Sequence, residues 1–406
     1  MKNFFLFLLL ICASVKVTGQ NNNIPVNIGH ADTLYSAILN ENRTLWIYTP
    51  AIDTSYFSKP NYPVLYILDG DSYFLSLMAM VQQLGVINGN TIFPEMIIVG
   101  VLNSNGNRTR DLTPSKSSLF TNSGGGENFT LFLKNELIPY MDKNYPTAPY
   151  RTLAGHSLGG LTVINTLLNH TSLFNAYIAI DPSMSYDNGK LLTQSENILK
   201  QKEFNRISLF LGIANTMKPG MDTSYVRKDT TQLTYHIRSI LKLRDNLNNT
   251  KSNLKWNSKY YPDDDHASIP LLSAYDGLRY IFRNNKFPDN QPVSQFFDKR
   301  YSALTIKNLI ESHYQSLSNE MGYQVRPSEM NINNLGYIFL QQKDYERAEM
   351  FFKINMAYYP NSFNVYDSIG DYYLSKGEKL LAVQYFKKAL SLKYRSDIKM
   401  KLDKSE

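Results

Sequence analysis

The stretch AGHSLGGL, residues 154–161, decides the fold. It holds a Gly-x-Ser-x-Gly pattern centred on Ser157, between a short strand-like run at 151–154 and a helix-like pattern at 160–169. A serine on a tight turn from a strand into a helix needs small flanking residues, here Gly155 and Gly159, and stands exposed above the sheet. The stretch therefore predicts a nucleophile elbow rather than an ordinary glycine-rich turn.

The segments around this elbow alternate between strand-like and helix-like patterns up to about residue 285. Strand-like runs lie at 43–48, 64–68, 96–102, 151–154, 176–180, 207–212 and 254–261, and amphipathic stretches lie at 127–144, 160–169 and 230–247. This alternation predicts an α/β fold, a mostly parallel sheet with helices on both faces. Active sites of such sheets lie at the carboxyl ends of the strands.

A polar segment at 284–292 separates this region from an all-helical part with an internal repeat. Leu335-Gly336-Tyr337 matches Ile369-Gly370-Asp371 at a spacing of 34 residues, which resembles two tetratricopeptide repeats. We predict a hydrolase domain at 20–285, a linker with packing helices at 286–328, and the repeats at 329–395. The repeats can bind a partner protein or simply cap the fold.

The first 19 residues are typical of a secretory signal peptide. Lys2 precedes an apolar run at 4–12, and small residues lie at 17–19, so we expect an exported protein, periplasmic or secreted, that begins at Gln20. Ile11 before Cys12 disfavours a lipoprotein signal. Since Cys12 is the only cysteine, the mature chain has no disulfide, thiol nucleophile or cysteine-bound metal.

The net charge and the hydropathy of the mature chain limit the kinds of partner that it can bind. The net charge of +7 falls to +5 without Lys2 and Lys16, and the remaining charges are dispersed rather than clustered, which argues against nucleic acid. No other apolar run is long enough to span a bilayer, so we expect no stable membrane insertion.

A serine nucleophile needs a general base, and the chain offers six histidines. Only His266 directly follows the last predicted strand, where the order serine, acid, histidine places the base. The acid is expected after the run at 207–212, where Asp222 and Asp229 both qualify. Asp229 also suits a helix N-cap, so Asp222 is favoured.

The oxyanion needs two backbone donors. The Leu158 N–H at the start of the helix is one, and the N–H of Gly70 or Asp71, after the run at 64–68, is the other. His156, beside the nucleophile, and Arg110 are candidates for the substrate pocket. Arg110 can grip an anionic group or simply pair with Asp111.

Several longer stretches resemble the esterase-D-like branch of α/β hydrolases, which includes feruloyl esterases and siderophore-triester esterases. They are SAILNENRTLWIYTP at 36–50, YILDGDSYF at 66–74, RTRDLTP at 108–114, GGGENFTLFLKNELIPYMDKNYPTAPYRTLAGHSLGGL at 124–161 and DDDHASIPL at 263–271. The resemblance covers about residues 28–283 and implies Ser157 as nucleophile and His266 as base. Many relatives carry Gly-x-x-Glu near the acid position, whereas this chain has Gly212-Ile213-Ala214-Asn215. A Ser–His dyad therefore stays open beside the triad.

These patterns predict an exported serine esterase that uses a Ser-His-Asp triad and an acyl-enzyme, with no cofactor or metal. Its substrate would be a small-molecule or glycan ester, and a siderophore trilactone is one alternative. The other alternative is a partner-binding protein whose repeats carry the function.

Overall fold

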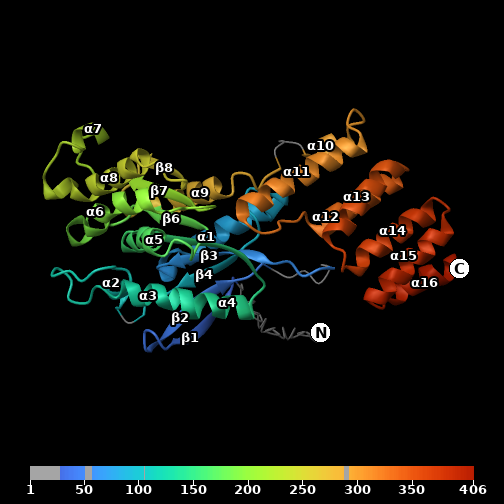
Figure 1. Ribbon diagram of the computed structural model, residues 1–406, viewed down its shortest axis with the longest axis horizontal. Coiled ribbons are helices and arrows are strands. Elements are labelled where there is room, and N and C mark those ends of the chain that lie inside the picture. The colour runs from blue at the N-terminus through green and yellow to red at the C-terminus, as the bar shows by residue number, and fades with distance from the viewer. Residues whose placement is uncertain (1–27, 51–56, 105, 288–291) are drawn as a thin grey trace, which may run out of the picture.

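The computed structural model describes residues 28–50, 57–104, 106–287 and 292–406, so the predicted signal peptide lies outside the described residues. Figure 1 shows an α/β part followed by a helical part. The α/β part is built on one eight-stranded sheet, in the order β1-β2-β4-β3-β5-β6-β7-β8. The strands are β1 His30–Ser36, β2 Glu41–Tyr48, β3 Tyr62–Leu68, β4 Ile97–Val101, β5 Thr147–His156, β6 Ala176–Ile180, β7 Ser208–Ala214 and β8 Lys255–Tyr261.

The sheet is parallel from β4 through β8. The two other pairings, β1 with β2 and β2 with β4, are antiparallel. Every residue of β3, β4, β6 and β7 is buried, which is typical of parallel strands covered on both faces. The predicted α/β-hydrolase fold is confirmed. The sequence missed β1, because this edge strand is polar and mostly exposed.

Helices cover both faces of the sheet and form two separate apolar cores. One core is covered by α1 Gly70–Gly85 and α9 Ile269–Ile281. The other is covered by α3 Gly126–Phe132, α4 Ile138–Asn144, α5 Leu158–Asn169, α6 Tyr186–Gln201 and α8 Tyr235–Asn249. Two short helices, α2 Arg108–Asp111 and α7 Thr223–Val226, lie in loops beyond the strand ends. Within the described residues, no helix is long and apolar enough to cross a membrane.

The C-terminal helices repeat the same contacts at a fixed spacing. They are α10 Pro292–Phe297, α11 Ala303–Met321, α12 Glu329–Gln341, α13 Tyr345–Tyr358, α14 Phe363–Ser375, α15 Lys379–Leu392 and α16 Ser396–Ser405. Gly336 lies against the ring of Phe352, and Gly370 lies in the same way against Phe386. Tyr337 donates to Asp371 across 34 residues at 2.7 Å. This recurrence accounts for the small residues found at the predicted repeat positions.

Helix α11 belongs to both parts of the molecule (Figure 1). Its first half contributes Ile306 and Ile310 to the core of the repeats. Its last residue, Met321, lies in the same apolar core as Tyr150 and Phe282 of the hydrolase part. The predicted boundary at 285 falls between α9 and α10, before this contact.

Candidate active site

The predicted elbow is a strained turn between β5 and α5. Ser157 has φ 58° and ψ −116°, a backbone conformation that a residue with a side chain adopts only when its surroundings impose it. A Cβ on Gly155 would lie 2.6 Å from the carbonyl carbon of Gly159, so the turn requires glycine at 155. The Ser157 N–H donates to the carbonyl of Ile180 at 3.0 Å. The serine is thereby fixed beside the end of the neighbouring strand β6.

Asp181 follows β6 directly and holds His266. The carboxylate is fully buried, and its Oδ2 lies 2.6 Å from Nδ1 of His266, in the loop after β8. Its Oδ1 accepts the Ala214 N–H at 2.9 Å. Burial alone would raise the pKa of Asp181, but hydrogen bonds from His236 and His266 outweigh it and hold that pKa well below its usual range. Asp181 is therefore an anion that accepts a hydrogen bond from the imidazole.

The prediction of Asp222 or Asp229 as the acid needs correction. Asp222 caps α7, where it accepts the N–H groups of Ser224 and Tyr225. Asp229 accepts hydrogen bonds from the hydroxyls of two nearby threonines. The sequence search looked after β7, whereas the carboxylate beside His266 follows β6. The aspartate directly after the apolar run at 176–180 was the signal available in the sequence.

Two contacts connect the elbow with His266 and with the segment after Asp181. The ring of His156 packs at a tilt of 43° against the ring of His266, with centroids 4.4 Å apart. The Ser157 hydroxyl lies 3.2 Å from the hydroxyl of Ser183, two residues after Asp181. Attack on a substrate would require the serine hydroxyl to turn from Ser183 toward Nε2 of His266, and such contacts often tighten only when substrate is bound.

His156 is a buried, neutral imidazole. Its Nδ1 lies 3.0 Å from the Tyr73 hydroxyl. Burial, followed by the charge of His266, lowers the pKa of His156 to about 4. With Tyr73, Leu77 and Leu271 it lines a small, mostly apolar cavity beside the elbow. His156 therefore lines the cavity and is not a candidate for a second general base.

The backbone N–H groups expected to bind the oxyanion lie at two helix N-termini. Helix α5 begins at Leu158 and α1 at Gly70, and the first N–H groups of a helix have no acceptor within the helix. A Cβ on Gly70 would lie 2.6 Å from the backbone of Gly100, so this turn packs tightly on β4. Asp69, in the left-handed conformation just before α1, accepts a bidentate pair from Arg108 at 2.6 and 2.8 Å. Gly70 and Asp71 both stay candidates for the second donor.

Arg110 is engaged elsewhere, which corrects its prediction as a substrate-pocket residue. Its guanidinium binds Glu41 at 2.8 and 3.1 Å and Asp111 at 2.7 Å. The hydrogen bond from Arg110 is the largest of the contacts that lower the pKa of Glu41 to about 2. Arg110 therefore braces its loop against β2, as the alternative interpretation predicted.

Asp181, His236 and His266 also form a group whose ligand atoms lie within 4.8 Å of one another. Two imidazole nitrogens and one carboxylate are ligands that zinc and iron accept. Here both nitrogens lie at hydrogen-bonding distance from the same oxygen, Oδ2 of Asp181. An ion bound at His266 Nδ1 would displace the proton that pairs this ring with the carboxylate. The site described above thus uses the group as hydrogen-bonding partners.

This geometry can be compared with known proteins. Residues 36–211 match the family model described as "Putative esterase". Residues 363–395 match a tetratricopeptide-repeat model. The resemblance predicted from the sequence, in both parts of the chain, is confirmed.

Two curated proteins with similar sequences are named as siderophore esterases. The ferri-bacillibactin esterase BesA of Bacillus subtilis is 29% identical over 189 residues, 41% of this chain and 63% of that protein. The siderophore triacetylfusarinine C esterase of Aspergillus fumigatus is 26% identical over 148 residues, 35% of this chain and 51% of that protein. The alignments thus span between half and two thirds of these curated relatives.

Solved structures share the fold. An IroE-like serine hydrolase from Shewanella oneidensis has a TM-score of 0.66 and 29% identity, covering 81% of this chain and 99% of that one. A protein from Capnocytophaga ochracea, 15% identical with a TM-score of 0.57, covers 93% of this chain and 99% of that one. The second match concerns the fold alone, and it extends through most of the chain.

Proposed function

We propose that this chain is a serine esterase that hydrolyses carboxylic esters through an acyl-enzyme on Ser157. The observation that carries the proposal is the hydrogen bond from His266 to buried Asp181, together with a serine on a strained elbow. Such an arrangement orients an imidazole to remove the proton from the serine hydroxyl. The match of residues 36–211 to an esterase family supports the same reaction.

The reaction follows from the positions of these groups. His266 would take the Ser157 proton at Nε2 while Oγ attacks the ester carbonyl, and Asp181 would stabilise the imidazolium through Nδ1. The N–H of Leu158 and that of Gly70 or Asp71 would bind the oxyanion. His266 would then protonate the departing alcohol and activate the water that releases the acid.

A direct test is hydrolysis of p-nitrophenyl acetate by residues 20–406 and by the Ser157→Ala variant. We expect turnover by the first and at least a thousandfold less by the second, since a triad acts as a unit. Ser224→Ala, which changes an exposed serine in α7, is the matched control and should retain full activity. A fluorophosphonate probe should label the parent and the control but not Ser157→Ala. Equal turnover by all three proteins would refute the proposal.

A siderophore ester is the more specific candidate substrate, because two curated relatives are named as siderophore esterases. It would be tested by comparing an iron-loaded catecholate trilactone with p-nitrophenyl acetate. A higher kcat/KM for the trilactone would support it, and activity only on the simple ester would exclude it.

We further propose that the protein is exported through residues 1–19 and that its repeats bind a partner protein. If the repeats alone carried the function, Ser157→Ala would leave that function intact, whereas loss of the repeats would abolish it.

A further inference from the structure

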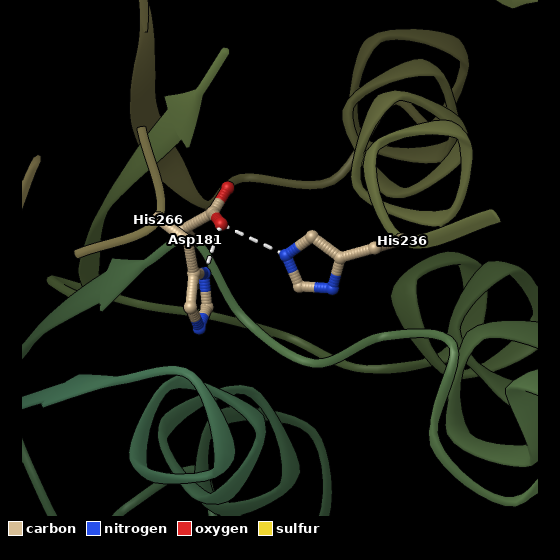
Figure 2. Close-up of side chains that lie close together, drawn as sticks. All are labelled: Asp181, His236 and His266. Atoms are coloured by element: carbon tan, nitrogen blue, oxygen red, sulfur yellow. Dashed lines mark hydrogen bonds and ion pairs between the residues drawn. The ribbon is translucent and has the colours of Figure 1, made fainter. Parts of the chain in front are cut away.

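The carboxylate of Asp181 accepts a hydrogen bond from a second imidazole, that of His236. Nε2 of His236 lies 2.8 Å from Oδ2 of Asp181, the same oxygen that His266 reaches at 2.6 Å. Figure 2 shows the two rings approaching this carboxylate from different sides. His236 lies in the first turn of α8, whereas His266 follows β8. Since an ionised carboxylate only accepts hydrogen bonds, both imidazoles act as donors.

His236 gives the carboxylate an anchor that does not depend on the base. The Ala214 N–H fixes Oδ1 at 2.9 Å, and His236 fixes Oδ2. With both oxygens held, rotation of the carboxylate is blocked before His266 makes its own bond. His266 therefore meets an acceptor whose direction is already set, as precise positioning of a catalytic group requires.

The two histidines are not interchangeable. His266 packs at a tilt against His156, the residue before Ser157. His236 instead meets His266 at an interplanar angle of 88° and a centroid distance of 5.1 Å. His236 uses Nε2 for Asp181. The start of its helix is held by Asp229, whose carboxylate binds the hydroxyl of Thr234 at 2.6 Å. The loop that contributed the mistaken acid candidates thus places this helix.

We propose that His236 is a positioning residue of the esterase reaction. It donates its Nε2 proton to Asp181 and holds the carboxylate in the orientation that accepts the Nδ1 proton of His266. This inference rests on the proposed function at Ser157. It predicts that loss of the donor lowers kcat and leaves KM unchanged, because His236 acts on the carboxylate and not on the substrate.

The test compares His236→Gln, His236→Asn and His236→Leu in the full mature chain, assayed with p-nitrophenyl acetate in the presence of EDTA. The glutamine amide can reach the position of Nε2, whereas the asparagine amide is too short and leucine has no donor. We expect His236→Leu and His236→Asn to lose about 10- to 100-fold in kcat, the effect of one hydrogen bond to a charged group. His236→Gln should recover to within about threefold of the parent enzyme.

The matched control is His170→Leu. His170 donates from Nε2 to Glu127 at 3.0 Å at the far end of α5, so this variant removes a similar pair outside the site. It should leave kcat unchanged. Thermal unfolding of each variant separates misfolding from misplacement of the carboxylate.

Unchanged kcat in His236→Leu, a rise in KM instead, or equal losses in the glutamine and asparagine variants would overturn the proposal. If Ser157→Ala is inactive while His236→Leu is fully active, only this inference fails. If Ser157→Ala retains full turnover, the esterase proposal itself fails.

Discussion

Asp181 decides at the scale of a single residue whether His266 can act as a base. We expect Asp181→Asn to lower kcat by about 10³- to 10⁴-fold, since an amide favours the wrong imidazole tautomer. The measurement is kcat for p-nitrophenyl acetate, alongside Asp222→Asn and Asp229→Asn. These two variants should stay within about threefold of the parent, because neither carboxylate bonds to His266.

Asp222 is the N-cap of α7, so its substitution serves as a control that affects stability and not the site. It accepts two N–H groups at the start of α7, so Asp222→Ala should cost about 1 kcal/mol of unfolding free energy, the usual cost of losing a cap. A loss of kcat in Asp222→Asn with full activity in Asp181→Asn would reverse the assignment of the acid.

At the scale of an element, the elbow depends on the close approach of β5 to α5. A Cβ on Gly155 would lie 2.6 Å from both the carbonyl carbon and the oxygen of Gly159, and this backbone can yield only if the helix moves. We expect Gly155→Ala to lose several kcal/mol of unfolding free energy, about the cost of overpacking a core, and most of its kcat. Urea unfolding and ester hydrolysis would measure both.

Gly89→Ala is the matched control for this substitution. Gly89 has φ +72°, but no atom lies within 4 Å of its would-be Cβ. It should lose only about 1–2 kcal/mol, the cost of a left-handed backbone, with kcat unchanged. Equal losses in the two variants would contradict this prediction, because the close approach of Gly155 to Gly159 would then add no cost of its own.

The elements also show how far the sequence could predict this molecule. The apolar strands β3 to β7 and the elbow are local patterns, so their places were predictable from spacing and hydropathy. The strand β1 has no such pattern and forms because β2 offers it a pairing edge. The partner of His266 is set by which strand ends meet, and in the folded sheet only β7 separates β6, which precedes Asp181, from β8, which precedes His266. For the same reason His236, 30 residues before His266, could not be linked to Asp181 from the sequence.

At the scale of the whole molecule, α11 joins the two parts through apolar contacts. Met321 is buried in the core that contains Tyr150 and Phe282, while Glu320 adds exposed bonds to Arg283 and Asn284. Because exposed ion pairs contribute little, the apolar contact should dominate. Glu320→Ala in the full chain is therefore expected to cost less than about 1 kcal/mol.

This contact predicts where the hydrolase part can be separated from the repeats. A chain that ends at residue 287 loses the Met321 contact, worth about 1.5–3 kcal/mol, and should be less stable and prone to aggregate. A chain that ends at residue 328 keeps the Met321 contact. In this chain Ile306 and Ile310 are changed to glutamine, because removal of the repeats would otherwise expose both side chains. We expect this longer chain to match the full protein in kcat and to exceed the shorter chain in midpoint of urea unfolding. If the two truncated chains unfold at the same urea concentration, α11 belongs to the repeats alone and the boundary predicted at 285 is the physical one.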